Sequence, residues 1–281
     1  MIAILGGLGA AVCWATATLC SSRSSRRMDP LVVVAWVMLI GLLIAGPAAA
    51  LSGIPAQLGA QAGWLALAGA GNVGGLLLSY RAMRIGQVSL VAPVVSTEGG
   101  IAALIALLRG ESVAASVGVT LAVIASGICL ASVPSDRSPQ TRASHPEAVA
   151  LAVLAALSFG AGLYATGEVG QALPASWAVL AARLVGTVTL ALPLALSGRL
   201  KLAPRTAKLL IASGVGEVLG FYSYTLGARH GIAVAAVLSS QFAVLSVAVA
   251  YLLFSERLAR IQLLGVIAVV AGVAVLSALR G

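Results

Sequence analysis

Three ionisable residues lie well inside long apolar stretches of this 281-residue chain: Glu98, Arg183 and Glu217. If these stretches cross a membrane, each charge costs roughly 2.5–3.5 kcal/mol, because hydrocarbon offers it no hydrogen bonds. Charged residues in such places commonly bind protons, ions or the charged groups of a substrate. The alternative is structural: Arg183 pairs with Glu98 or with Glu217, and the charges neutralise one another between helices.

Glu98 interrupts the apolar run 91–108 and is followed directly by Gly99 and Gly100. Two successive glycines loosen a helix and let other backbone approach it closely. Burial disfavours the ionised form of a carboxylate, so a buried glutamate can load and release protons near neutral pH. We therefore expect Glu98 to take part directly in binding a proton or the substrate.

The composition indicates that these stretches do cross a membrane. Hydrophobic residues make up 60% of the chain, charged residues 9%, and the mean hydropathy is +1.07, whereas about 25% of the residues of a soluble domain are charged. The net charge of +9 is spread over single Lys and Arg residues, without the basic, aromatic-interleaved stripe that nucleic-acid binding requires. Cys13, Cys20 and Cys129 have no metal-ligand spacing and are interpreted as small buried residues.

The length of the apolar runs predicts the number of crossings. A bilayer core requires about 20 apolar residues per helix. Ten transmembrane helices are predicted on this basis, at 2–20, 31–52, 63–80, 88–108, 113–132, 148–167, 175–198, 207–227, 232–253 and 261–279. The first has no preceding basic residues and is expected to be a retained span rather than a signal peptide.

The two halves of the chain are related to each other. A shift of 145 residues places Gly69, Gly71, Val73, Gly75, Arg84, Gly86, Glu111 and Gly127 on Gly214, Gly216, Val218, Gly220, Arg229, Gly231, Glu256 and Gly272. A match of Arg, Gly and Glu at one fixed offset indicates an internal duplication. We expect a first five-helix repeat at 1–132, a polar linker at 133–147 and a second five-helix repeat at 148–281.

An odd number of spans in each repeat means that the second copy enters the membrane inverted. The loops after the odd-numbered spans contain thirteen Lys and Arg residues: Arg23, Arg26, Arg27, Arg81, Arg84, Arg137, Arg142, Arg199, Lys201, Arg205, Lys208, Arg257 and Arg260. The opposite side contains only Arg109, Arg229 and Arg280. Since positive loops stay in the cytoplasm, both termini are predicted to be external. The predicted fold class is an all-α membrane protein of ten transmembrane helices in two inverted five-helix repeats, an arrangement typical of secondary transporters.

The start and the end of the fourth span of each repeat carry a recognisable pattern. The first copy reads IGQVSLVAPVVSTEGGIAALIALLRGES, with Gly86, Pro93, Gly110 and Glu111, and the second reads HGIAVAAVLSSQFAVLSVAVAYLLFSER. In these residues the chain resembles the EamA family of the drug/metabolite transporter superfamily. The resemblance implies a ten-helix carrier with a central cavity lined by spans 1, 3, 4, 6, 8 and 9. Where family members often have proline, this chain has Glu98 and Ala243.

Several polar and aromatic residues lie on the spans that the resemblance assigns to the cavity. The candidates for lining it are Trp14, Asn72, Tyr164, Tyr222 and Gln241. Asn72 and Glu217 are equivalent under the repeat shift, and each lies within a G-x-x-x-G frame typical of close helix packing. We expect them to face each other across a pseudo-twofold axis. Glu111 and Glu256 are interpreted as polar anchors at helix ends, and Tyr80 as an interfacial anchor.

These observations predict a secondary transporter that moves small metabolites, such as amino acids or drug-like compounds, across the cytoplasmic membrane by alternating access with proton coupling. Its partners are expected to be the substrate, the lipid bilayer and, if it is not a monomer, a second copy of the chain. No intramembrane Asp pair, Ser-His dyad, metal-ligand cluster or phosphate-binding glycine loop is present in the sequence, so neither an enzyme nor a cofactor is expected. The alternative is a sensor or assembly subunit built on the same scaffold.

Overall fold

The computed structural model describes residues 1–25, 27–85, 91, 94–131, 146–242, 244–245 and 260–280. Within these ranges the regular structure is helical, and no strand occurs. The helices are α1 (Ile2–Ser25), α2 (Pro30–Leu51), α3 (Ala62–Ile85), α5 (Glu98–Leu108), α6 (Ala115–Ala131), α7 (Pro146–Ala172), α8 (Ala175–Gly186), η1 (Thr187–Ala191), α9 (Leu192–Leu196), η2 (Pro204–Thr206), α10 (Ala207–Ala228), α11 (Ile232–Ser239) and α13 (Arg260–Arg280).

Each of the ten predicted spans overlaps at least one of these helices. Six helical stretches in the described residues are long and apolar enough to cross a membrane: 2–25, 30–51, 62–79, 146–172, 175–196 and 204–228. Shorter apolar helices occupy 98–108, 115–130 and 263–273. The chain is therefore a multi-pass membrane protein. The full count of ten crossings stays a prediction, as do the repeat boundaries at 132 and 148. The end of the first repeat, the side chain of Tyr80 and all of Glu256 lie outside the described residues, so the roles of Tyr80 and Glu256 also stay predictions.

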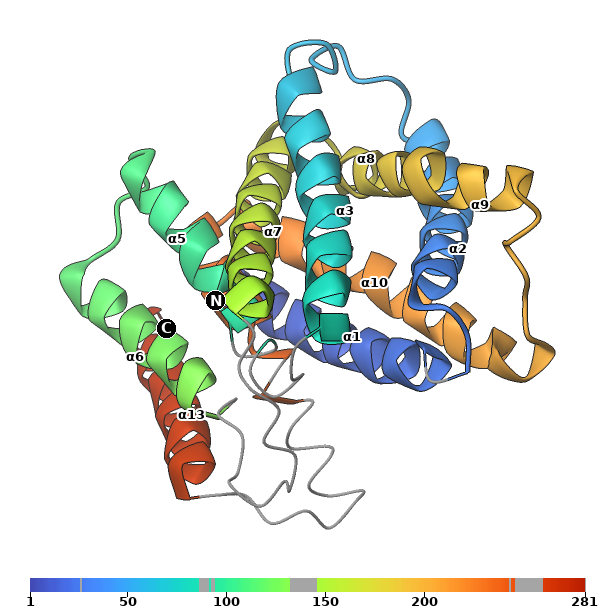
Figure 1. Cartoon of the computed structure of the whole chain (residues 1–281). Helices are drawn as coiled ribbons and strands as arrows, with labels where there is room; N and C mark the ends of the chain where they lie inside the picture. Colours follow the sequence, from blue (N-terminus) through green and yellow to red (C-terminus); the bar gives the residue numbers. More distant parts are fainter. Residues whose placement is uncertain are drawn as a thin grey trace.

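The helices of the two halves pack against each other in equivalent pairs. α1 packs along α10, and α3 packs along α7 (Figure 1). A Cβ on Gly75 would overlap the ring of Phe159, and a Cβ on Gly220 would overlap the ring of Trp14. Because Gly220 and Phe159 lie one repeat offset beyond Gly75 and Trp14, these are two copies of one contact. Small residues allow this close approach between membrane helices.

The last helix of each half forms a separate pair. α6 packs along α13, to one side of the other helices (Figure 1). Gly127 of α6 meets Val269 and Ala268, while Gly272 of α13 meets Ile124. Gly127 and Gly272 are equivalent in the repeat, as are Ile124 and Val269. The contacts thus repeat the internal duplication in three dimensions.

Two of the predicted spans are not continuous helices, which corrects the sequence interpretation. The fourth span, predicted at 88–108, has a turn at Ser96–Thr97 and resumes as α5 at Glu98. The ninth, predicted at 232–253, has its helix α11 end at Ser239, followed by a turn at Ser240–Gln241. The hydroxyls of Ser and Thr in these turns bond to nearby backbone carbonyls, which competes with helical hydrogen bonding. Hydropathy alone does not reveal such an interruption.

The two interruptions lie within one residue of equivalent positions, and they meet. α5 packs against α11. A Cβ on Gly99 would overlap the carbonyl oxygen of Ala236 and the side chain of Ser240, so glycine is required there. Interrupted helices at corresponding positions of two inverted repeats are the feature that marks the binding site in many secondary transporters.

Candidate functional site

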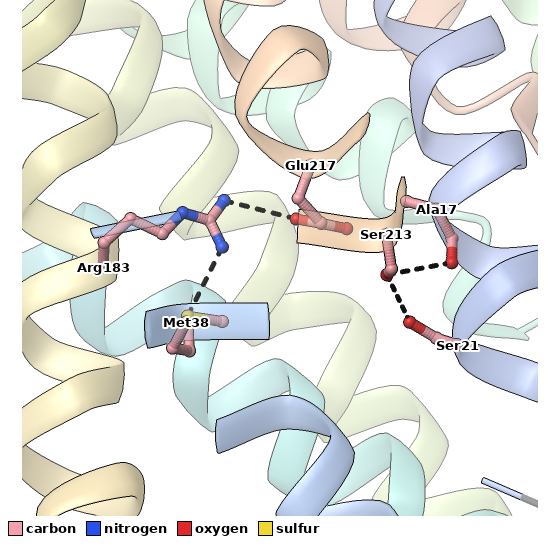
Figure 2. Close-up of polar contacts among 6 residues, drawn as sticks. All are labelled: Ala17, Ser21, Met38, Arg183, Ser213 and Glu217. Carbon is pink, nitrogen blue, oxygen red and sulfur yellow. Dashed lines mark hydrogen bonds and ion pairs between the residues drawn. The ribbon is translucent and has the colours of Figure 1, made fainter. Parts of the chain in front are cut away.

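The centre of the candidate site is Arg183, on α8. Its side chain is completely buried, and its guanidinium donates hydrogen bonds of 3.3 Å to a carboxylate oxygen of Glu217 and 3.3 Å to the sulfur of Met38. Figure 2 shows this guanidinium between α10 and α2. The guanidinium carbon also lies 5.0 Å from the centre of the Phe221 ring, within the range of a cation–π interaction.

The structure decides between the two pairings that the sequence left open. Arg183 pairs with Glu217, and the ion pairs of the described residues do not include Arg183 with Glu98. The two partners differ in accessibility: the Arg183 side chain is 0% exposed, whereas the Glu217 side chain is 24% exposed. Glu217 is therefore the accessible charge of the pair.

Room for Arg183 is made by a small residue on the facing helix. A Cβ on Gly41 of α2 would overlap the arginine side chain, and a Cβ on Gly186 of α8 would overlap Met38. Gly41 and Gly186 are equivalent in the repeat, and so are Met38 and Arg183. α2 and α8 thus cross at glycines in a symmetric way, and the long side chains of Met38 and Arg183 fill the crossing.

Aromatic rings extend the site along α1 and α10. Trp14 lies edge-on to Phe221, with ring centres 5.1 Å apart, and tilted against Tyr224 at 6.1 Å. The indole rests on Gly220, where no side chain intervenes. The rings of Trp14 and Phe221 are almost fully buried. They form an apolar wall beside the ion pair.

A chain of hydroxyl groups follows the same helices one turn further along. The Ser213 hydroxyl lies 3.1 Å from the backbone oxygen of Ala17 and 2.6 Å from the hydroxyl of Ser21 (Figure 2). Ser213 lies one helical turn before Glu217 on α10. The polar surface therefore continues from the ion pair toward the Ser21 end of α1.

Glu98 lies on the fourth span, between α7 and α11. It is the first residue of α5 and only 8% exposed. Its backbone is held between two helices, because its carbonyl oxygen would meet a Cβ on Gly160 of α7 and the following Gly99 touches α11. Of the three predicted intramembrane charges, Arg183 and Glu217 form a pair, and the ion pairs of the described residues do not include Glu98.

Four of the predicted site residues contain a buried polar atom without a hydrogen-bond partner among the described residues. These atoms are Trp14 Nε1, Asn72 Oδ1, Arg183 Nε and Gln241 Nε2. Buried polar groups in folded proteins are nearly always paired, so an unpaired group calls for an explanation. Asn72 lies on α3 beside α7, and Gln241 lies at the turn after α11. That Asn72 faces Glu217 stays a prediction.

The two predicted tyrosines have protein partners. Tyr164 is buried, donates its hydroxyl to the Glu168 carboxylate and lies edge-on to Trp64 at 5.7 Å. Tyr222 is half-buried and lies beside Ser176 of α8. Glu168 was missed in the sequence because the predicted sixth span ended at 167, whereas α7 continues to Ala172. Met38 and Phe221 were missed as well, although the repeat shift from Arg183 leads directly to Met38.

A small cavity of about 180 Å³ lies beside the helix interruptions. It is lined by Ser96, Thr97, Gly100, Ala125, Ser126, Ile128, Cys129 and Ser240. Hydroxyl-bearing residues from three spans contribute to its lining, which is otherwise mostly apolar. Gly100 has open space where a side chain would be, in contrast to Gly99.

Comparison with known proteins supplies a family and a fold. The model of the EamA-like transporter family matches residues 1–133 and 147–278. No curated protein matches the chain. A solved structure, described only as "Crystal structure of protein", is similar to it with a TM-score of 0.77. The similarity covers 99% of this chain and 96% of that chain at 18% sequence identity, and it supports the fold alone.

Proposed function

Because the chain belongs to the EamA-like transporter family, we propose that it is a secondary transporter that carries small metabolites across a cytoplasmic membrane by alternating access. The family is one of membrane transporters, and the apolar helices agree with it. Interrupted helices that cross at the interface of two inverted repeats can change their relative orientation, and many transporters that work by alternating access have such helices at the binding site.

The unpaired buried polar atoms of four predicted site residues, Trp14, Asn72, Arg183 and Gln241, are the observation that carries this proposal. An indole N–H, a guanidinium N–H, an amide oxygen and an amide N–H are buried without partners in the described residues. If these atoms had only a structural role, each would stay unpaired and would destabilise the fold by about 1–3 kcal/mol. A polar cargo that satisfies several of them at once would recover that free energy on binding.

The chemistry of the site favours an amphipathic cargo. Glu217 offers an accessible negative charge beside the buried Arg183, and Trp14 and Phe221 offer aromatic surface. Amino acids and drug-like compounds combine a charged or polar group with apolar area, and they match this arrangement. Apolar surface with a few convergent polar groups is the usual composition of a small-molecule site.

Proton coupling is the second element of the proposal. Glu98 is almost completely buried, and the ion pairs of the described residues do not include it, so its ionised carboxylate is costly there. A proton or a cationic group on Glu98 removes this cost. Occupancy of Glu98 therefore biases the conformation of the interrupted spans, and a ligand shifts a conformational equilibrium only through such differential interaction.

The test is a comparison of metabolite pools. Cells that overproduce the protein are compared with cells that lack it, and the pools outside the cells are profiled by mass spectrometry. We expect a small set of amphipathic metabolites to change in opposite directions in the two strains, and the change to disappear with Glu217→Gln at equal membrane abundance. Pools that do not respond to either strain would speak for a sensor or assembly subunit instead.

A further inference from the structure

The carboxylate of Glu111 caps the helix α11 from the other half of the molecule. It accepts hydrogen bonds from the backbone N–H of Ile232 at 3.0 Å and of Ala233 at 3.2 Å. α11 cannot cap itself, because Gly231 occupies its N-cap position with a φ of +142° and has no side chain. The first amides of α11 therefore depend on a residue that precedes them by more than 120 positions. Negative charge at a helix N-terminus is stabilising.

A built turn holds Glu111 in this place. α5 ends at Leu108, and the backbone N–H of Glu111 bonds back to the carbonyl oxygen of Ala106 at 2.9 Å. Gly110 makes the turn possible with a φ of +98°, a conformation that other residues rarely adopt. Glu111 is thus fixed to the end of α5 and moves with it. A displacement of α5 relative to α11 must change the Glu111–α11 contact.

Other contacts join the two halves at the same end of the molecule. This end, where α2, α5 and α7 finish and α3, α8 and α11 begin, is called the α2–α3 end. The Trp64 ring meets Tyr164, the hydroxyls of Ser52 and Ser176 lie 3.1 Å apart, and the indole N–H of Trp177 donates to the carbonyl oxygen of Gly53 at 3.0 Å. These are aromatic and neutral polar contacts, each weaker than a carboxylate with several backbone donors.

The lever between the crossing point and the cap amplifies small rotations. α5 crosses α11 at Gly99, and its last residue, Leu108, lies nine residues further along the helix, a length of roughly 14 Å. A rotation of about 10° at Gly99 would move the far end of α5 by roughly 2 Å, which is enough to break a hydrogen bond.

We propose that the contact between Glu111 and the first amides of α11 is a latch: it holds the α2–α3 end closed, and it opens once in each transport cycle. This inference rests on the alternating-access function proposed above. Glu111 is only part-buried, so water replaces its partners when the contact opens, and water-mediated hydrogen bonds are nearly as favourable as direct ones. The latch thus has a strong but reversible effect on the equilibrium.

The experiment measures the distance across the α2–α3 end. Spin labels are attached at Leu108→Cys, on the end of α5, and His230→Cys, just before α11, in full-length protein in nanodiscs with Cys13, Cys20 and Cys129 replaced by alanine. Both positions are exposed. Double electron–electron resonance then gives the populations of short and long distances. Glu147→Ala is the matched control, since Glu147 also joins the halves but in an exposed pair with Arg81.

We expect Glu111→Ala to raise the ratio of long to short distances by about tenfold or more. Glu111→Gln keeps an acceptor oxygen and should raise the ratio by a smaller factor, while Glu147→Ala leaves it unchanged. A Glu111→Ala distribution equal to that of Glu147→Ala would overturn the latch, even if thermal stability fell, because Glu111 would then be a static cap. If Glu111→Ala does not insert, Glu111→Gln decides by the same comparison with the control.

The outcome separates the latch from the proposed function. A single distance in every variant and at every pH would contradict alternating access itself, and the latch with it. Two distance populations whose ratio is the same with and without the Glu111→Ala substitution would overturn only the latch. Two populations that respond to Glu111, in a protein that changes no metabolite pool, would support the latch and contradict the transport function.

Discussion

The guanidinium of Arg183 donates a hydrogen bond of 3.3 Å to the sulfur of Met38, the residue 145 positions earlier. The same offset relates the two halves of the sequence, so two equivalent positions are in direct contact. Equivalent residues of an inverted repeat touch only where the pseudo-twofold axis passes between them. The Arg183–Glu217 pair therefore lies beside this axis, where secondary transporters bind their cargo. In the repeat, Met38 and Asn72 are the residues equivalent to Arg183 and Glu217, so the charged pair has neutral counterparts in the first half.

The ion pair should behave as one unit in stability measurements. Arg183→Met leaves the Glu217 carboxylate unpaired and is expected to cost about 3 kcal/mol, at the low end for a buried pair because the Glu217 side chain is 24% exposed. The double variant Arg183→Met with Glu217→Asn copies the residues at the equivalent positions and should cost less than Arg183→Met alone. Thermal unfolding in detergent measures both. Additive losses in the double variant would show that the two side chains do not stabilise each other.

Glu98 should control the pH dependence of transport. Glu98→Gln keeps the volume and the hydrogen-bonding capacity of the side chain but cannot take up or release a proton. We expect the variant to insert normally, to lose most gradient-driven transport, and to show no pH dependence between about pH 6 and pH 8. The measurement is flux of an identified substrate in proteoliposomes at a series of pH values, with Glu147→Gln as the control. A pH profile identical to that of the unchanged protein would remove Glu98 from the coupling mechanism.

Alanine substitutions at the two glycines after Glu98 should differ sharply in their effects on stability and transport. A side chain at Gly99 overlaps Ala236 and Ser240, whereas one at Gly100 meets nothing within 4 Å. Gly99→Ala is expected to destabilise the protein by about 1–3 kcal/mol and to abolish transport, because it separates the crossing spans. Gly100→Ala should change stability by less than about 0.5 kcal/mol. Unfolding temperatures and flux of the matched pair test this, and equal effects at both positions would contradict the packing at Gly99.

The charge bias of the loops predicts the orientation. With thirteen Lys and Arg residues on one side against three on the other, the C-terminus is expected to be external. Gly281→Cys in a protein without the three native cysteines should react with a membrane-impermeant maleimide in intact spheroplasts. Labelling that requires lysis would reverse the orientation.

The sequence alone determined the class of protein and its internal symmetry. Apolar length shows that helices cross a membrane, because hydrocarbon excludes charge regardless of tertiary contacts. The G-x-x-x-G frames also predicted close helix packing, and paired helices do touch at Gly71, Gly75, Gly216 and Gly220. Glu98, Arg183 and Glu217 could be identified as candidate site residues because a charged side chain in hydrocarbon is costly unless it is paired or functional.

Only the tertiary structure decided which charges pair and where the helices break. Arg183 could reach either glutamate as far as the sequence shows, and the choice of Glu217 depends on the crossing of α2, α8 and α10. The interruptions at Ser96–Thr97 and Ser240–Gln241 fall on short polar stretches within apolar runs, and such polar residues do not by themselves show whether a helix continues through them. Glu111 looked like a helix-end anchor, and its partners 121 and 122 residues away were set by the packing of one repeat on the other. Contacts between distant segments are a property of the folded arrangement, which local residue patterns do not contain.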